Sequence, residues 1–187
     1  MKEITVNNEK FVLFLSEEKI KRRVRALAKQ INRDYRGRVP IFIGVLNGSF
    51  IFFSDLIRGI TIDCEVDFLK LSSYGDAKIS SGDVRVIKEL NCKVRDRDII
   101  VVEDIVDSGK SIEFMKRLIM KDHPASFAVV TLLFKKEVAS VDFPLDYVGF
   151  AVSRDFVIGY GLDYAQKVRN LKSIYRLAKP HNTAMRG

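Results

Sequence analysis

Near its middle the chain reads Val101-Val102-Glu103-Asp104-Ile105-Val106-Asp107-Ser108-Gly109-Lys110-Ser111. The apolar residues before Glu103 are typical of a buried strand. From Ser111 onward, apolar residues are spaced as in a helix. Two carboxylates stand at the expected strand end, and a third, Asp107, stands in the loop that follows. Ligands of open α/β sheets bind beyond the carboxyl ends of strands, and free N–H groups at a helix start favour a phosphate. The stretch therefore predicts an α/β sheet with a phosphate-binding loop.

Two simpler interpretations of this stretch fit less well. A plain strand–loop–helix turn capped by Asp107 or Ser108 would explain any one residue, but it does not explain an exposed Glu103–Asp104 pair at the strand end. Gly109-Lys110-Ser111 copies the end of a P-loop. That pattern needs glycine at position 104, where this chain has a carboxylate that would repel polyphosphate.

Apolar strands alternate with helical runs along the rest of the chain. Ser16 is a good helix N-cap, and the helix that follows is expected to end at Gly37. Further helices are expected at residues 50–58 and 111–121, and strands at residues 39–46, 63–71, 84–89, 98–102, 126–134 and 146–152. This order predicts an α/β fold with a central, mostly parallel sheet flanked by helices. Residues 1–187 are expected to form one domain, with a small hood mainly from about residues 142–187.

Composition sets the broad class of the protein. The formal net charge of +8 fits either a well-solvated surface or a polyanionic ligand, and composition alone leaves both open. Cys64 and Cys92 form no CxxC pair, which indicates a reducing compartment and a cytoplasmic protein. The isolated His123 and His181 argue against a zinc site. No apolar run approaches the length of a membrane span, so no membrane partner is expected.

Residues 101–111 resemble the phosphoribosyl-pyrophosphate-binding motif of type I phosphoribosyltransferases. That motif has an apolar strand, two acidic residues, two apolar residues and then Asp-Ser/Thr-Gly-x-Ser/Thr. The resemblance implies that Glu103 and Asp104 hold the ribose hydroxyls. It also implies that Asp107 accepts a proton near purine N7. The implied phosphoribosyl-pyrophosphate loop comprises Asp107, Ser108, Gly109, Lys110 and Ser111.

Two loops resemble parts of the hypoxanthine–guanine branch of this family. Residues 46–49 resemble its pyrophosphate loop, which implies that Asn47 and Gly48 contact pyrophosphate. Many members have Lys at the position of Asn47, so backbone N–H groups are expected to replace that contact here. Ser73 and Tyr74 lie in a segment, residues 72–83, that resembles the lid closing over the reaction.

Two later segments resemble the purine side of the same site. Lys135, which follows an apolar strand, resembles the lysine that contacts the purine 6-oxo group. Residues 155–164 resemble the base-binding and metal segment. The implied roles are stacking on the purine by Phe156, backbone contacts from Val157, purine binding by Asp163, Mg²⁺ binding by Asp163 with Glu103 and Asp104, and pyrophosphate binding by Arg169.

The resemblance implies a Mg²⁺-dependent enzyme that joins hypoxanthine or guanine to 5-phosphoribosyl-1-pyrophosphate in purine salvage. It also implies a homodimer or homotetramer and no nucleic-acid partner. A regulator with the same fold that binds nucleic acid is the alternative; the charge of +8 favours it, and the retained acidic residues count against it. A non-catalytic nucleotide sensor would differ only by lacking turnover. The sequence leaves open the preference between hypoxanthine and guanine and any use of xanthine.

Overall fold

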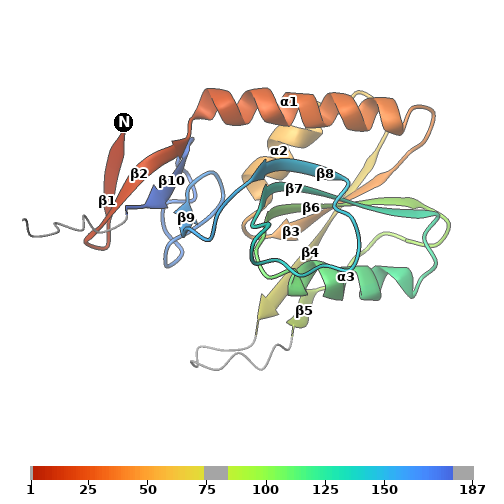
Figure 1. Cartoon of the computed structure of the whole chain (residues 1–187). Helices are drawn as coiled ribbons and strands as arrows, with labels where there is room; N and C mark the ends of the chain where they lie inside the picture. The colour runs from red at the N-terminus through yellow and green to blue at the C-terminus, as the bar shows by residue number, and fades with distance from the viewer. Residues whose placement is uncertain (1, 74–83, 179–187) are drawn as a thin grey trace, which may run out of the picture.

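The computed structural model describes residues 2–73 and 84–178 of the chain. These residues form a six-stranded sheet, covered by helices, and a separate four-stranded sheet at one end of it (Figure 1). The larger sheet has the strand order β5-β4-β3-β6-β7-β8. No helix within the described ranges is both long and apolar enough to cross a membrane.

Five of the six strands of the larger sheet run parallel to one another. They are β3 (Ile41–Leu46), β4 (Glu65–Ser73), β6 (Asp98–Val106), β7 (Ser126–Phe134) and β8 (Tyr147–Ala151). The edge strand β5 (Val84–Lys88) returns antiparallel to β4. The central strands are apolar on both faces because helices cover both, which confirms the predicted α/β class with its mostly parallel sheet.

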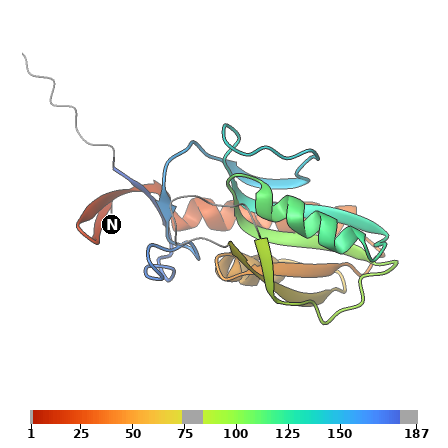
Figure 2. The same ribbon diagram turned by 90° about the horizontal axis from the view of Figure 1, so that it is seen from below.

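The helices cover opposite faces of this sheet (Figures 1 and 2). α1 (Glu17–Asp34) and α2 (Phe50–Ile57) share one hydrophobic core with the sheet, and α3 (Lys110–Met120) shares the other. Ser16 caps α1 as predicted, since its Oγ accepts the N–H of Lys19 at 3.3 Å. One stripe of α1 is buried at helical spacing, formed by Ile20, Val24, Leu27, Ala28 and Ile31.

The order of the strands creates a switch point in the middle of the sheet. From β3 the chain moves outward through β4 to β5, and it then returns to β6 on the other side of β3. From β6 it continues outward to β7 and β8. The loops that follow β3 and β6 therefore leave the sheet in opposite directions, and in open α/β sheets the crevice between two such loops is where ligands bind.

The smaller sheet is the hood, and its composition corrects the prediction. It has the order β1-β2-β10-β9, with β1 (Glu3–Val6), β2 (Glu9–Leu15), β9 (Val157–Ile158) and β10 (Ile174–Leu177). Two of its strands thus come from the N-terminus, whereas β8, which was assigned to the hood, pairs with β7 in the main sheet. Asn7 and Asn8 have φ of 48° and 64°, values typical of a two-residue hairpin turn, and the two adjacent asparagines are a sequence signal for such a turn.

Candidate active site

The acidic pair lies inside β6 and not at an exposed strand end, because the strand extends four residues beyond the predicted 98–102. Glu103 pairs across the sheet with Thr131 of β7. Asp104 is only 8% exposed, and its Oδ1 accepts the N–H of Ile105 at 3.0 Å. Glu103 Oε2 is buried and has no hydrogen-bond partner among the described residues. A buried oxygen of this kind fits a ligand that brings a cation or a hydroxyl donor.

Both acidic groups have raised pKa values. Burial and the neighbouring Asp104 raise the pKa of Glu103 well above its ordinary value. Burial also raises the pKa of Asp104 to about 6, although the nearby Arg169 and backbone N–H groups act in the opposite direction. Two carboxylates held this close in a dry site are costly for the free protein, so a bound cation would stabilise their ionised forms.

The loop after β6 leads directly into α3. Gly109 is the N-cap of α3, and Ser140 donates its N–H to the carbonyl oxygen of Ser108 at 3.1 Å. The side chains of Ser108, Lys110 and Ser111 are exposed. A cavity of about 70 Å³ lies between this loop and β6, lined by Glu103, Ile105, Val106, Asp107, Ser108, Gly109, Ser111 and Ile112. Its position at a helix N-terminus suits a phosphate group.

The loop after β3 meets the acidic pair from the other side of the switch point. A Cβ on Gly48 would lie 1.8 Å from Asp104 Oδ2, so only glycine fits there. Gly48 also touches the hood, since a Cβ on Gly161 would lie 2.1 Å from the carbonyl oxygen of Gly48. The Leu46–Asn47 peptide is cis, and the Asn47 side chain is exposed.

Arg169 and Asp163 reach this crevice through the hood segment around Gly161. Arg169 Nη1 donates to the carbonyl oxygen of Gly161 at 2.8 Å, and its Nη2 lies 2.8 Å from Asp163 Oδ1. Asp163 Oδ2 also accepts the N–H of Gln166 at 2.8 Å. The structure therefore brings together four residues that are far apart in sequence: Gly48, Asp104, Gly161 and Arg169.

Lys135 and Asp107 form an ion pair that the sequence analysis missed. Lys135 Nζ lies 2.8 Å from Asp107 Oδ2. The lysine is buried, whereas the Asp107 side chain is 53% exposed and open to a ligand. Both residues follow neighbouring parallel strands, and their 28-residue separation gave no local signal.

The other purine-side residues belong to the hood. Phe156 is 43% exposed and rests against the rings of Phe11 and Tyr164, with centroid distances of 6.2 and 5.5 Å. Val157 is buried in β9, opposite Arg176 of β10. An exposed aromatic ring with fixed neighbours offers a flat surface for stacking.

The predicted lid is only partly covered by the structure. Ser73 ends β4, where it pairs with Val84 of β5. Tyr74 and the rest of the segment to residue 83 lie outside the described residues.

A buried acidic pair, a phosphate loop at a helix start and a basic hood residue surround one crevice. Together they are typical of the class of α/β proteins that bind phosphorylated ligands at the switch point of the sheet. Residues 14–165 match the phosphoribosyl transferase domain, so the chain belongs to the phosphoribosyltransferase family.

Individual relatives agree with this membership. The hypoxanthine-guanine phosphoribosyltransferase of Bacillus subtilis is 42% identical over 162 residues, which cover 87% of this chain and 90% of the relative. A crystal structure of the hypoxanthine-guanine phosphoribosyltransferase of Bacillus anthracis superposes with a TM-score of 0.84 at 40% identity, covering 89% of this chain and 98% of that one. The resemblance to type I phosphoribosyltransferases is therefore confirmed.

A third relative is a longer protein. The bifunctional protein TilS/HprT of Listeria monocytogenes is 41% identical over 170 residues, which cover 91% of this chain. This chain spans only 26% of the length of that relative.

Proposed function

We propose that this protein transfers the 5-phosphoribosyl group of 5-phosphoribosyl-1-pyrophosphate to N9 of hypoxanthine or guanine. The products are pyrophosphate and IMP or GMP, as the names of the relatives suggest. The observation that carries the proposal is the buried Glu103–Asp104 pair, held between the phosphate loop and Gly48. Such a pair suits the two ribose hydroxyls of the substrate, which can donate hydrogen bonds to it.

The reaction breaks the bond between the sugar C1 and pyrophosphate and forms a bond between C1 and purine N9. A purine that carries its proton on N7 must lose this proton, and Asp107 is the proposed acceptor. The ion pair with Lys135 keeps the Asp107 carboxylate in place, and the lysine ammonium is available to the 6-oxo group. Phe156 would stack on the base, and backbone groups of Val157 would meet its edge.

The pyrophosphate end of the substrate is assigned to the crevice beside Gly48. Backbone groups at Asn47 and Gly48, with the guanidinium of Arg169, would hold it, and the loop from Ser108 to Ser111 would hold the 5′-phosphate. Asn47→Ala should therefore weaken pyrophosphate binding only modestly. A loss above about 3 kcal/mol would show that the Asn47 side chain itself is needed.

Mg²⁺ is the proposed cofactor, with Glu103, Asp104 and Asp163 as the residues that would hold it. Within the described ranges no three such side chains form a complete metal site. Mg²⁺ commonly takes one or two carboxylates and completes its shell with substrate oxygens and water. When bound, it would neutralise charge on the leaving pyrophosphate.

A spectrophotometric assay with phosphoribosyl-pyrophosphate, Mg²⁺ and each purine in turn tests the proposal. Hypoxanthine and guanine should be converted to nucleotides, and the same assay measures the preference between them. Absence of turnover with every oxopurine would contradict the proposal. We also propose a cytoplasmic homodimer or homotetramer, which light scattering on the purified protein can check.

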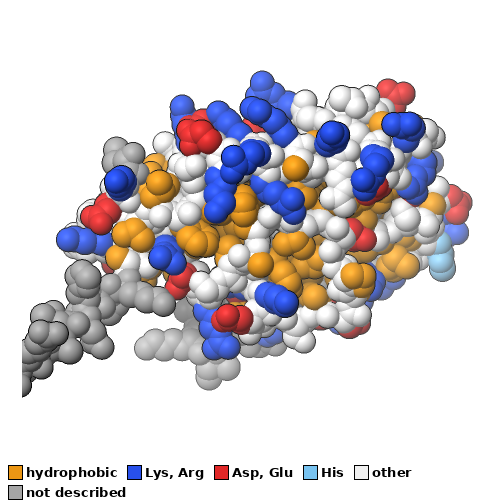
Figure 3. Space-filling view, turned by 45° about the horizontal axis from the view of Figure 1, so that its top comes forward, with side chains coloured by type: hydrophobic (Ala, Val, Ile, Leu, Met, Phe, Trp, Pro, Cys, Tyr) orange, Lys and Arg blue, Asp and Glu red, His pale blue; other side chains and the backbone are white. Residues whose placement is uncertain are grey.

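One observation favours a second candidate function, nucleic-acid binding. Lys and Arg side chains gather on the molecular face that carries α1 (Figure 3). The solvent side of this helix presents Arg22, Arg25, Lys29 and Arg33 at helical spacing. An RNA titration at several salt concentrations tests this function, since genuine phosphate contacts weaken steeply with salt.

A further inference from the structure

Tyr160 lies between the two halves of the site and has no role in the function proposed above. It stands in a tight turn of the hood, where Gly159, Tyr160 and Gly161 have φ of 94°, 53° and 102°. Positive φ is unfavourable for a tyrosine, so the surrounding contacts must hold this turn. Two backbone hydrogen bonds do so, from Tyr160 N to Leu171 O at 2.8 Å and from Gly161 N to Arg169 O at 2.9 Å.

The side chain of Tyr160 leaves the hood and enters the main domain. Only 4% of the residue is exposed, and its ring belongs to the core that α1 and α2 share with the sheet. The hydroxyl donates to Asp55 Oδ2 at 2.7 Å. Asp55 belongs to α2, which begins immediately after the pyrophosphate loop at residues 46–49.

The hood contacts the pyrophosphate loop itself and also the helix that follows it. Gly161 lies close to the carbonyl oxygen of Gly48, and Tyr160 donates a hydrogen bond to Asp55 of α2. The same hood turn carries Arg169, which donates to the carbonyl oxygen of Gly161. Arg169 is held by the turn at residues 159–161, and this turn is held in place by α2, which follows the pyrophosphate loop. These contacts therefore fix the distance between Arg169 and the pyrophosphate loop.

We propose that Tyr160 is a positioning residue, whose hydrogen bond to Asp55 sets the hood cation Arg169 against the pyrophosphate loop. The inference rests on the proposed function, because it assigns pyrophosphate to this crevice. Tyr160 touches neither substrate nor reacting atoms. It acts by keeping two binding elements in register, and small displacements of such elements weaken binding and catalysis.

Tyr160→Phe removes the hydroxyl and keeps the ring, so it tests the bond with little change in packing. Pyrophosphate affinity in the presence of Mg²⁺, measured by calorimetry, should fall about tenfold, the effect of one hydrogen bond to a charged group. Asp55→Ala should cause the same loss, and the double variant should be no worse than either single variant. Asp55→Asn keeps an acceptor oxygen and should restore most of the affinity.

Tyr147→Phe is the matched control. Tyr147 is 6% exposed, and its hydroxyl donates to Asp34 Oδ2 at 3.1 Å. It begins β8, beside Val130 of β7, and its hydroxyl partner Asp34 ends α1, so its hydrogen bond involves neither α2 nor the hood. This variant should lose stability as Tyr160→Phe does, but it should keep wild-type pyrophosphate affinity.

Three outcomes are separable. Equal pyrophosphate affinity in Tyr160→Phe and Tyr147→Phe would overturn the positioning role. If Tyr160→Phe fails to fold, Asp55→Ala measured against Asp55→Asn tests the same bond from the α2 side, and equal affinity of these two would also overturn it. A wild-type protein that binds pyrophosphate but converts no purine would instead refute the proposed function and leave the positioning role standing.

Discussion

At the scale of single residues, the chemistry of the candidate site depends on carboxylates with different surroundings. Asp107 is exposed and paired with Lys135, so its carboxyl group is accessible to a purine proton. Asp107→Asn should lower kcat by about 10²–10⁴-fold, the usual contribution of a general base, with a far smaller change in phosphoribosyl-pyrophosphate affinity. Steady-state kinetics give both quantities, and Glu137→Gln is a control at an exposed carboxylate. An unchanged kcat would remove Asp107 from the mechanism.

Asp104, unlike Asp107, is buried. Its pKa in the folded protein is about 6, above the ordinary value of 3.8. A raised carboxyl pKa stabilises the fold below the unfolded pKa, and this contribution is lost as the pH rises through 6. Asp104→Asn should thus raise the free energy of unfolding of the free protein at pH 8 by roughly 1–3 kcal/mol, which appears as a higher Tm. The gain should disappear towards pH 4. Thermal melts across this pH range check the sign. A variant less stable than wild type at pH 8 would contradict it.

The sequence indicated candidate residues for the site but not their environment. Glu103, Asp104 and the loop from Asp107 to Ser111 were proposed from local order, because strand, carboxylates and helix start are adjacent in the chain. The burial of Asp104 could not be predicted, since Gly48, which packs against it, comes from a distant part of the sequence. The Lys135–Asp107 and Tyr160–Asp55 contacts were missed for the same reason.

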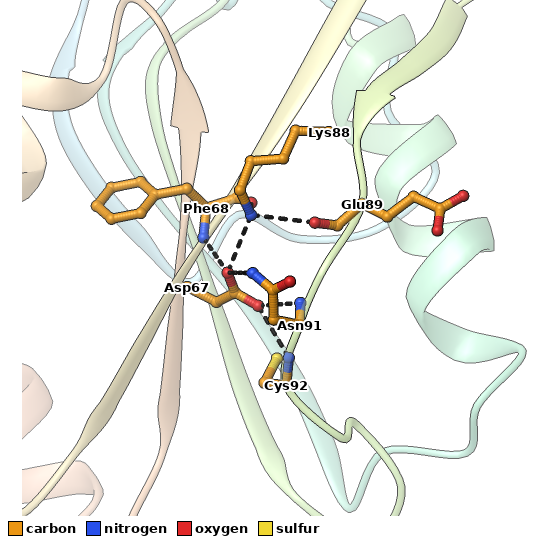
Figure 4. Close-up of polar contacts among 6 residues, drawn as sticks. All are labelled: Asp67, Phe68, Lys88, Glu89, Asn91 and Cys92. Carbon is orange, nitrogen blue, oxygen red and sulfur yellow. Dashed lines mark hydrogen bonds and ion pairs between the residues drawn. The ribbon is translucent and has the colours of Figure 1, made fainter.

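At the scale of elements, a buried carboxylate fixes the returning chain at the base of the β4–β5 ribbon. Asp67 of β4 accepts the N–H groups of Asn91 and Cys92 at 2.6 and 3.0 Å, and Lys88 Nζ lies 3.3 Å from it (Figure 4). Burial alone would raise the pKa of Asp67, but these donors and the N–H of Phe68 hold it well below its usual value.

Asp67→Ala should destabilise the protein by about 2–4 kcal/mol, because it leaves the N–H groups of Asn91 and Cys92 without their charged acceptor. The depressed pKa makes this contribution present above the ordinary carboxyl pKa, near 4, and it is lost as the pH falls further. Denaturant unfolding at pH 7 measures the loss, with the exposed Asp63→Ala as control. Equal stabilities of the two variants at pH 7 would show that the Asp67 contacts do not stabilise the ribbon.

Periodicity predicted most elements within a few residues, and it failed where long-range pairing decides the outcome. The buried stripe of α1 and the apolar runs of β3 and β7 are local patterns, so their positions were recovered. β1 and β2 form a short hairpin that joins C-terminal strands only in the folded protein. The hood therefore unites both ends of the described chain, and no local signal indicates that pairing.

At the scale of the whole molecule, we expect base choice to depend on both sheets, since Lys135 follows a main-sheet strand and Phe156 belongs to the hood. A lysine ammonium has three donors and no acceptor. Hypoxanthine and guanine would present a 6-oxo acceptor to it, whereas adenine would place a 6-amino donor against the ammonium donors. Sites built around a polar substrate group can reject analogues that lack it by about 10⁴–10⁵-fold. Adenine should therefore be a very poor substrate.

Lys135→Ala should narrow this gap in kcat/KM, mainly by lowering activity on hypoxanthine, because the variant loses the donor and also leaves Asp107 without its partner at 2.8 Å. Lys136→Ala is the matched control, since its side chain is exposed next to Lys135 and should not affect base choice. The measurement is kcat/KM for adenine and hypoxanthine in wild type and both variants. If wild type used adenine within about tenfold of hypoxanthine, where the unpaired donors predict a much larger gap, the 6-oxopurine assignment would be wrong.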